Sequence, residues 1–221
     1  MLVALLGNPV AGSLSPRMQN AAFAARGLDW RYEAFEVEDV VAAVQGLVSL
    51  GFAGANVTIP HKQAVVAACD ESDGEAINTL VIHDGRVTGH NTDREILHGI
   101  AATRACVIGG GGAARALAPV LPVATVTYTR SGLWPPDSTG CDLIVNATPV
   151  RDNVLVSLEA GQTVVDLAYG PVETALVAAA RAAGCTVVDG REALVRQGAA
   201  SFRLWTGLEP PLDVMRAAVR P

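Results

Sequence analysis

The chain has 221 residues, half of them hydrophobic and 17% charged, with a formal net charge of −6. The apolar fraction is too high for a disordered chain, and a negative charge without any basic run argues against binding to nucleic acid or to an anionic membrane. No apolar segment reaches membrane-spanning length, and the first residues lack the features of a secretory leader. We therefore expect a globular cytoplasmic protein that binds neither nucleic acid nor a membrane.

The cysteines and histidines form no metal or disulfide pattern. Cys69, Cys106, Cys141 and Cys185 are far apart without a Cys-x-x-Cys pair, and the four histidines show no His-Glu-x-x-His pattern. Isolated cysteines in mostly apolar surroundings are typical of buried thiols in a reducing compartment. We expect no disulfide and no structural metal.

Strands and helices alternate in the first half of the chain. Strands are expected over 2–6, 30–37 and 51–58, and helices over 15–25, over 38–50 and from His61. Ser15 followed by Pro16 fits a helix N-cap with proline at the first helical position. Asp84-Gly85 predicts the turn of a hairpin between 79–82 and 86–88. This order predicts an α/β sandwich.

The second half alternates again after a helix expected over 94–101. Strands are expected over 105–108, 124–128, 142–145, 163–167 and 185–188, and helices over 112–121, 173–183, 192–205 and 212–219. This pattern predicts a doubly wound, mostly parallel sheet of the Rossmann type. We place one domain at 1–93, completed by the C-terminal helices within 191–221, and a second domain at 94–190.

A glycine-rich turn connects the first strand and helix of the second domain. The apolar run that ends at Ile108 is followed by Gly109, Gly110, Gly111 and Gly112 and then by an alanine-rich stretch from Ala113. Such a turn exposes backbone N–H groups to which a pyrophosphate can bind. A tight strand-to-helix connection without a ligand would show the same pattern, so the turn alone is weak evidence.

The residues after the next strand indicate which dinucleotide would bind. An acidic residue at this position accepts a hydrogen bond from the ribose 2′-OH of NAD, whereas a basic residue favours the 2′-phosphate of NADP. The segment 127–131 contains no carboxylate and contains Arg130. Arginine can bind phosphate with two hydrogen bonds and stack on adenine. We favour NADP over NAD, the alternative being that Arg130 is a solvated loop residue.

Polar residues in the first half follow the strands at the edge where a parallel sheet binds ligands. They are Ser13 with Ser15, Thr58 with Lys62, and Asn78 with Asn91-Thr92-Asp93. Hydroxyl and amide groups of this kind suit a small polyhydroxylated acid. Lys62 and Asp93 could form an acid–base pair, in which burial would lower and the carboxylate would raise the pKa of the amine. The alternative is that Lys62 is an ordinary solvated residue.

A series of short motifs extends along essentially the whole chain. In order, they are Gly7-Asn8-Pro9, Ser13-Leu14-Ser15-Pro16, Asn56-Val57-Thr58-Ile59-Pro60-His61-Lys62, Ala76-Ile77-Asn78-Thr79, Asn91-Thr92-Asp93, Gly109-Gly110-Gly111-Gly112-Ala113-Ala114-Arg115, Asn146-Ala147-Thr148-Pro149, Gln197-Gly198-Ala199 and Trp205-Thr206-Gly207. With these motifs the chain resembles the shikimate dehydrogenase family. The segment that ends at Lys62 and the segment that ends at Asp93 are far more specific to the family than the glycine-rich turn.

The resemblance implies NADP-dependent reduction of 3-dehydroshikimate to shikimate, a step of aromatic amino-acid biosynthesis. It implies that Lys62 and Asp93 are catalytic and that Lys62, as an ammonium group, protonates the developing alkoxide. It also implies two sets of binding residues. The substrate residues would be Ser13 and Ser15 for the carboxylate, Thr58, Asn78, Asp93 and Gln197 for the hydroxyls, and Tyr169 nearby. The cofactor residues would be Gly109, Gly111, Gly112, Ala113, Arg130, Asn146 and Thr148.

The chain departs from the family pattern in length and at a few positions. It is shorter than typical members, with apparent losses before Glu75, before Cys106 and after Arg130. Gln19 replaces a common histidine, and Arg94 stands where a small residue is usual. Arg94 could compete with Lys62 for Asp93 or point to solvent, and we favour solvent.

Three functions follow as hypotheses. The first is the dehydrogenase just described. The second is a related dehydrogenase that acts on quinate or on an amino analogue of shikimate with NAD or NADP. The third is an inactive relative that binds shikimate-like ligands as a sensor. The sequence leaves a monomer and a homodimer equally open.

Overall fold

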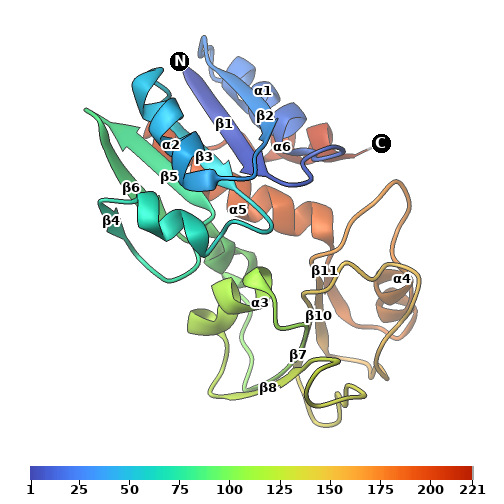
Figure 1. Ribbon diagram of the computed structural model, residues 1–221. Helices are drawn as coiled ribbons and strands as arrows, with labels where there is room; N and C mark the ends of the chain where they lie inside the picture. The colour runs from blue at the N-terminus through green and yellow to red at the C-terminus, as the bar shows by residue number, and fades with distance from the viewer. Residues whose placement is uncertain (221) are drawn as a thin grey trace. The chain divides into compact units, whose positions relative to one another are not determined.

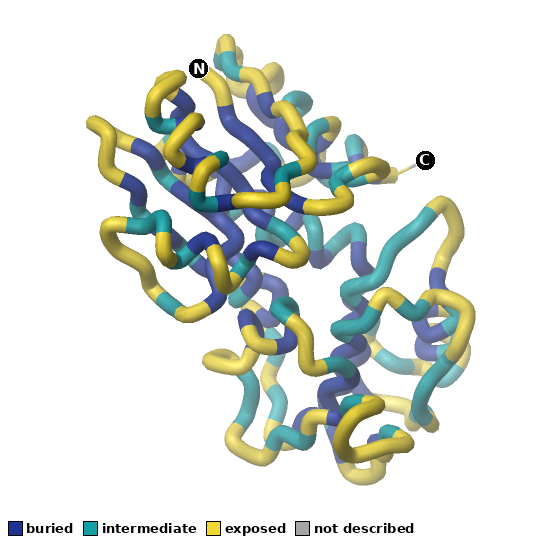
Figure 2. Tube along the Cα trace, in the orientation of Figure 1, coloured by how far each residue is buried: buried dark blue, intermediate teal, exposed yellow. Residues whose placement is uncertain are grey.

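The computed structural model describes residues 1–220, which divide into two compact α/β units (Figure 1). The first unit contains Met1–Glu95 and Val195–Arg220, and the second contains Ile96–Leu194. In both units the central strands are largely buried, whereas most connecting loops are exposed (Figure 2). The chain therefore forms most of the first unit, then the whole second unit, and finally returns to complete the first.

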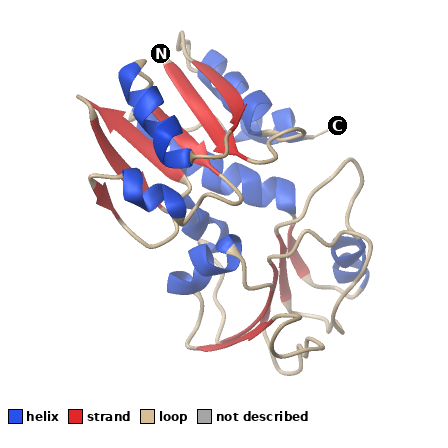
Figure 3. Cartoon of the chain, in the orientation of Figure 1, coloured by secondary structure: helices blue, strands red, loops and turns tan. Residues whose placement is uncertain are grey.

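The first unit is built on a mixed sheet, whose strands are red in Figure 3. The sheet has six strands in the order β2-β1-β3-β5-β6-β4. Its strands are β1 (Leu2–Gly7), β2 (Arg31–Glu36), β3 (Gly54–Val57), β4 (Glu71–Ser72), β5 (Thr79–His83) and β6 (Arg86–His90). β1 is parallel to β2 and β3, whereas β5 is antiparallel to β3 and β6. The predicted hairpin turn is confirmed: Asp84 and Gly85 have φ values of 50° and 77°, as a tight two-residue turn requires.

Helices cover both faces of this sheet (Figure 1). They are α1 (Ser15–Ala25), α2 (Val40–Ser49), the end of α5 (Gly190–Thr206) and α6 (Leu212–Val219). Asp39 caps α2 by accepting two backbone N–H groups of its first turn. Ala4 and Leu6 of β1 share a core with the apolar side of α2. On the other face, Phe23 of α1 stacks on Phe202 of α5 with ring centroids 5.6 Å apart. The buried strands are therefore apolar on both faces.

The start of α1 differs from the prediction that Ser15 is its N-cap. Leu14 occupies the N-cap position, and no side chain caps the first turn. Instead, Ser13 Oγ accepts the backbone N–H of Ser15 at 3.3 Å. The turn before the helix is thus closed by Ser13, and the Ser15 hydroxyl is not used as a cap.

Two segments that we predicted as α-helices are 3₁₀ helices. They are η1 (Ala64–Ala68), which follows His61, and η2 (Thr92–Leu97), which was expected over 94–101. At the start of η2, Thr92 N–H donates to Asn78 Oδ1 at 2.8 Å and Asp93 N–H donates to Asn91 Oδ1 at 3.2 Å. Side-chain acceptors of this kind compete with regular helical hydrogen bonds. The segment therefore forms a short turn that holds Asp93 in a fixed place.

The second unit contains a five-stranded parallel sheet with the order β11-β10-β9-β7-β8. Its strands are β7 (Arg104–Ile108), β8 (Ala124–Tyr128), β9 (Leu143–Asn146), β10 (Thr163–Asp166) and β11 (Thr186–Val188), and its helices are α3 (Gly112–Leu117), η3 (Ala118–Val120) and α4 (Ala175–Ala182). The predicted doubly wound sheet is confirmed. From β7 the chain goes to β8 on one side and then to β9 on the other. The carboxyl ends of β7 and β9 therefore form the switch point at which such sheets bind ligands.

Side chains alternate along β7 between two cores, one on each face of the sheet. Ala105 and Val107 lie in the core that also contains residues of α3, whereas Cys106 and Ile108 lie in the core that contains residues of α4. This period of two is the geometry of a strand covered on both faces. Burial raises the pKa of the Cys106 thiol to about 12, so it stays protonated at neutral pH. All four cysteines are free.

The described residues include no helix that is long and apolar enough to cross a membrane. Among residues 1–220, no three His, Cys, Asp or Glu side chains are grouped so that they could hold a metal ion.

Asp142 joins the beginning of β9 to the beginning of β7, and we predict that this link depends on pH. Asp142 Oδ2 accepts hydrogen bonds from the N–H and the hydroxyl of Thr103, both at 2.7 Å, and Oδ1 accepts the N–H of Arg104 at 2.9 Å. The Thr103 hydroxyl and then these backbone donors lower the pKa of Asp142 to about 2. Because this pKa lies below the ordinary value of 3.8, the carboxylate contributes stability above that value, and the contribution is lost as the pH falls toward 2.

The variant Asp142→Asn should therefore unfold at a lower temperature than the wild type at pH 7. The difference should shrink as the pH falls from about 4 to about 2, because the wild-type carboxyl group also becomes neutral there. Thermal unfolding followed by circular dichroism at several pH values would measure it. Asp152→Asn, at an exposed position, is the matched control and should show little change. A difference that is constant with pH would contradict the prediction.

Candidate active site

In the first unit, the structure brings together the two predicted catalytic side chains. Lys62 Nζ donates a hydrogen bond to Asp93 Oδ2 and forms an ion pair with it. The side chains of Lys62 and Asp93 are only 15% and 9% exposed, so the pair is partly shielded from water. Lys62 lies in the turn after β3, and its backbone carbonyl accepts the N–H of Ile77 at 2.8 Å. Asp93 lies in η2. Both ends of the pair are therefore held by the backbone.

Asn78 connects this pair to a second predicted substrate residue. Asn78 Nδ2 donates to Asp93 Oδ1 at 2.9 Å and to Gln197 Oε1 at 3.3 Å. Asn78 Oδ1 accepts the N–H and the hydroxyl of Thr92 at 2.8 and 3.1 Å. Lys62, Asp93, Asn78 and Gln197 are thus one hydrogen-bonded set. Asp93 accepts bonds on both oxygens, which fixes the carboxylate plane beside Lys62.

A buried network of side-chain hydrogen bonds, which the sequence analysis did not predict, is connected to this set through the carbonyl of Asn78. Tyr32 Oη donates to Asn56 Oδ1 at 2.8 Å, and Asn56 Nδ2 donates at 3.0 Å to Thr79 Oγ1, to Ser201 Oγ and to the carbonyl of Asn78. Buried polar groups of this kind need partners, and here they join β2, β3, β5 and α5. The available signal was Asn56 itself, a polar residue in an otherwise apolar buried strand.

Arg94 neither competes for Asp93 nor points freely to solvent, so the expectation of a solvated side chain is wrong. Its Nη2 donates to the carbonyl of Asp73 at 2.8 Å. Asp73 in turn accepts the N–H of Asn91 at 2.9 Å, and Asn91 Oδ1 accepts the N–H of Asp93. Arg94 therefore braces the loop that holds Asp93, while the Asp93 carboxylate remains with Lys62 and Asn78.

The remaining predicted substrate residues of this unit follow the carboxyl ends of neighbouring strands. Ser13 and Ser15 follow β1, and Thr58 follows β3, which pairs with β1. Ser15 is buried, whereas Ser13 and Thr58 are half-buried. A Cβ at Gly7 would lie 2.3 Å from Thr58 Cγ2. The glycine therefore allows the loop after β3 to pack directly on the end of β1.

Lys62 also differs from every other cationic side chain in the protein. It is the only lysine of the chain, whereas there are 15 arginines. Arginine remains charged under all ordinary conditions, but a lysine amine can give up and regain a proton. The presence of one lysine among 15 arginines is therefore a second signal in the sequence, besides motif spacing, that points to Lys62 as a functional residue.

In the second unit, the glycine-rich turn contains two glycines with different roles. Gly109 has φ 112°, and a Cβ there would lie 2.9 Å from the carbonyl oxygen of Ala147. Gly111 has an ordinary φ of −78°, and a Cβ there would meet no atom within 4 Å. The fold itself requires glycine at 109. It does not require glycine at 111, where the backbone faces open space.

Beside this turn, Asn146 and Thr148 form the loop after β9. Asn146 Nδ2 donates to Asp166 Oδ1 at 2.9 Å, and Asn146 Oδ1 accepts the N–H and hydroxyl of Thr148 at 3.0 and 2.6 Å. Asn146 has no exposed surface, which does not fit the predicted direct contact with a cofactor. Burial raises the pKa of Asp166, although bonds from Thr174 and other groups oppose the shift. Asn146 shapes the loop on which the half-buried Thr148 is presented.

Arg130 follows β8 and is exposed. Its Cζ lies 5.8 Å from the centre of the Trp134 ring. Neither an ion pair nor a hydrogen bond to a carboxylate is found for it among residues 1–220. The preceding residue, Thr129, lies against the glycine-rich turn, because a Cβ at Gly110 would be 2.9 Å from Thr129 Cγ2.

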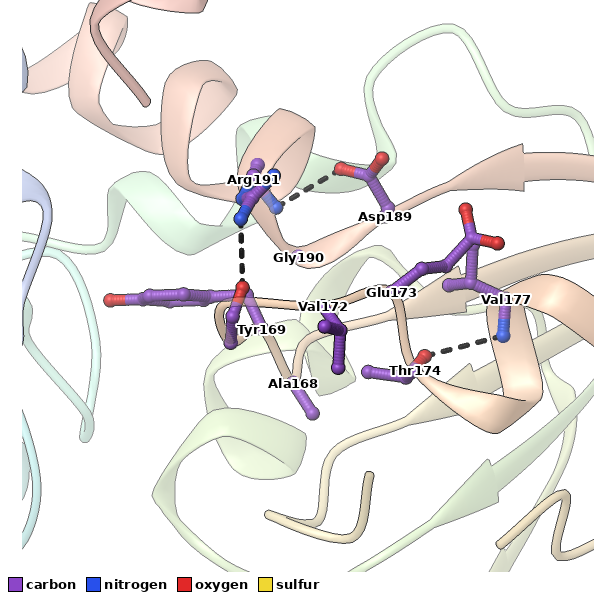
Figure 4. Close-up of a pocket in the computed structure, with 10 residues that line it drawn as sticks. Ala168, Tyr169, Val172, Glu173, Thr174, Val177, Asp189, Gly190 and Arg191 are labelled. Carbon is purple, nitrogen blue, oxygen red and sulfur yellow. Dashed lines mark hydrogen bonds between the residues drawn. The ribbon is translucent and has the colours of Figure 1, made fainter. Parts of the chain in front are cut away.

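Tyr169 lies in the second unit, unlike the other predicted substrate residues. It follows β10 and lines a small pocket with Val172, Thr174, Asp189 and other residues. The Tyr169 ring points away from Val172 and Thr174 (Figure 4). Arg191 closes one side of the pocket by donating to the carbonyl of Gly170 at 2.8 Å. Tyr169 therefore belongs to a pocket of the second unit, and its role near the substrate stays a prediction.

Comparison with family models defines the class of protein to which these features belong. Residues 5–80 match the shikimate dehydrogenase substrate binding domain, and residues 190–220 match the shikimate 5′-dehydrogenase C-terminal domain. The first match contains Lys62 and Asn78, and the second contains Gln197.

Complete relatives extend these matches over nearly the whole chain. The shikimate dehydrogenase (NADP(+)) of Moorella thermoacetica is 40% identical, and the alignment covers 99% of this chain and 92% of the relative. The chain therefore belongs to the shikimate dehydrogenase family. Because that alignment spans 272 positions and the chain has 221 residues, the relative contains internal segments that this chain lacks. The prediction of a shortened member is confirmed.

Two solved structures are similar to the fold as a whole. The shikimate 5-dehydrogenase of Thermus thermophilus, in complex with NADP(H) and shikimate, is 31% identical, with a TM-score of 0.86 and coverage of 99% of this chain and 98% of that chain. The quinate dehydrogenase of Corynebacterium glutamicum, in complex with NAD, is 29% identical, with a TM-score of 0.81 and the same coverage of both chains.

Proposed function

We propose that this chain is a shikimate dehydrogenase that interconverts 3-dehydroshikimate and shikimate with NADP. The observation that carries the proposal is the Lys62–Asp93 pair, shielded from water and fixed by Asn78 in a chain of this family. We assign the first unit as the substrate domain and the second as the NADP domain. We also place the enzyme in the cytoplasm, where four free cysteines suit the reducing conditions.

The residues of the second unit fit NADP. Gly111 leaves open space over the backbone, which suits a pyrophosphate that must approach N–H groups closely. Gly109, Gly112 and Ala113 continue that backbone stretch, and Thr148 is presented beside it by Asn146. Arg130 follows β8 without a carboxylate partner in the described chain, which suits a 2′-phosphate. When bound, NADPH supplies the hydride that reduces the substrate carbonyl.

The residues of the first unit would bind the substrate and move its proton. The hydroxyls of Ser13 and Ser15 donate to the substrate carboxylate, and Thr58, Asn78 and Gln197 contact its hydroxyl groups. Lys62, as an ammonium group, donates a proton to the carbonyl oxygen as negative charge develops on it. Asp93 holds Lys62 in place and accepts a hydrogen bond from a neighbouring substrate hydroxyl, which orients the ring.

A matrix of two substrates and two cofactors tests the proposal. Shikimate and quinate are each assayed with NADP⁺ and NAD⁺, and reduced nicotinamide is followed by absorbance. We expect the highest kcat/KM for shikimate with NADP⁺. Failure to turn over shikimate with either cofactor would overturn the proposal, and binding of shikimate without turnover would identify a sensor instead.

A related dehydrogenase acting on quinate is the second candidate. Arg130 is the one basic residue of the 127–137 segment. A 2′-phosphate would therefore meet a single positive charge there, which makes NAD a possible cofactor. The similar quinate dehydrogenase structure contains NAD. A higher kcat/KM for quinate with NAD⁺ in the same matrix would favour this candidate.

A further inference from the structure

The loop after β8 folds back on itself so that Arg130 meets an aromatic ring. Thr129 N–H donates to the carbonyl of Leu133 at 3.1 Å, and Gly132 N–H donates to the carbonyl of Thr129 at 3.0 Å. These two bonds close a tight turn. The turn brings Trp134 to Arg130, whose Cζ lies 5.8 Å from the ring centre, within the range of a cation–π contact.

In the described chain, no hydrogen bond or ion pair uses the Arg130 guanidinium beside this contact. Within residues 1–220 the guanidinium has no carboxylate partner. A guanidinium that lies over an aromatic ring still has N–H donors for a ligand, in the fork that matches the oxygens of a phosphate. Trp134 is 41% exposed, so it is also not part of the core. The pair is therefore a cation held by an aromatic ring and open to an anion.

The position of the pair determines which anion would reach it. Arg130 follows β8, the strand next to β7, and Thr129 touches the glycine-rich turn at Gly110. In dinucleotide-binding sheets, the end of this neighbouring strand contacts the 2′ position of the adenosine ribose. An arginine here would normally lose much side-chain freedom when it binds phosphate.

We propose that Trp134 orients the Arg130 guanidinium as a receptor for the 2′-phosphate of the cofactor, and so acts as a positioning residue for NADP selectivity. This inference rests on the proposed function. Trp134 restricts Arg130 before the ligand arrives, which lets a single basic residue distinguish the two dinucleotides. A second basic residue in the segment is not needed.

Calorimetry with two adenosine ligands tests this role without any turnover. Adenosine 2′,5′-bisphosphate contains the 2′-phosphate, and adenosine 5′-monophosphate lacks it. Trp134→Leu should weaken binding of the bisphosphate by about two- to fivefold and leave binding of the monophosphate unchanged. Trp134→Phe should keep most of the affinity, because it retains an aromatic face. Trp30→Phe, in the first unit, is the control and should change neither.

Arg130 supplies the decisive comparison. Arg130→Ala should weaken binding of the bisphosphate by about tenfold or more, and adding Trp134→Leu to it should cause no further loss. Equal weakening of both ligands by Trp134→Leu, additive effects in the double variant, or no binding of the bisphosphate to the wild type would each overturn the inference. The proposed function fails separately, through absent turnover of shikimate. Unfolding temperatures of all variants exclude a general loss of structure.

Discussion

Lys62→Ala is expected to lower kcat by about 10² to 10⁴, the range for loss of a positioned acid or base. The affinity for shikimate should change much less, because Ser13, Ser15 and Asn78 remain. The value of kcat should fall because neither Asp93, Asn78 nor Gln197 can replace Lys62 as the proton donor to the substrate oxygen. Steady-state kinetics gives kcat, and calorimetry with shikimate alone gives the affinity.

Lys62→Arg is the matched control for this prediction. Arginine keeps the positive charge and can still pair with Asp93, but it does not give up its proton. We expect Lys62→Arg to bind shikimate and to remain nearly as inactive as Lys62→Ala. If Lys62→Arg were close to wild type in kcat, the ion pair alone would account for the role of Lys62, and proton transfer by this residue would be contradicted.

The single lysine allows an independent check on the wild-type protein. Lys62 and the N-terminal amine are the only primary amines of the chain. An amine-directed reagent should therefore inactivate the enzyme through one side chain, and shikimate should protect against it. Mass spectrometry locates the modification, and Lys62→Arg should be modified at the N-terminus alone. Inactivation without modification of Lys62 would contradict the assignment.

The sheets could be predicted from the sequence because local pattern and tertiary packing agree in them. The residues of β7 are apolar on both faces and lead into glycines, and the structure buries them in two separate cores. Asp84-Gly85 likewise favours positive φ locally, and the hairpin forms there. In both cases the residues near in sequence are also the ones that decide the conformation.

The predictions of helix type were wrong where side chains distant in the sequence supply the hydrogen bonds. The N–H of Thr92 donates to the side chain of Asn78, which precedes it by 14 residues. The helical periodicity of 94–101 therefore could not predict the 3₁₀ helix. Arg94 bonds to Asp73 across 21 positions, and the two alternatives considered for it both omitted that partner. Such contacts follow from the fold and are not encoded in local spacing.

The candidate site shows the same division. The Lys62–Asp93 pair could be predicted because both residues follow ends of strands in one sheet and because the family resemblance singled them out. The Tyr32–Asn56–Ser201 network could not be predicted in full, since its members lie far apart in the sequence and only Asn56, a polar residue in a buried strand, gave a signal. The sequence also does not show whether a motif residue contacts the ligand or only positions its neighbours. Asn146 belongs to such a motif, but it is fully buried in the structure.

Gly111→Ala is expected to weaken NADPH binding by at least about tenfold, or about 1.4 kcal/mol, while the fold and shikimate binding are retained. A Cβ at this position meets no protein atom within 4 Å, and φ is −78°, so alanine fits the free protein. The space that the methyl group occupies is the space that a pyrophosphate needs in order to reach the backbone. Calorimetry with NADPH and with shikimate measures the two affinities separately.

Two glycine variants bracket this result. Gly46→Ala, inside α2 with open space around its Cβ, should raise stability by about 0.5–1 kcal/mol and leave both ligands bound. Gly109→Ala should lower the unfolding temperature, because its φ is 112° and its Cβ would meet the carbonyl of Ala147 at 2.9 Å. Gly111→Ala should resemble Gly46→Ala in stability and differ from it in NADPH affinity alone. If Gly111→Ala bound NADPH as tightly as the wild type, the pyrophosphate would not lie on this stretch of backbone, and the placement of the cofactor beside Gly109–Gly112 would be wrong.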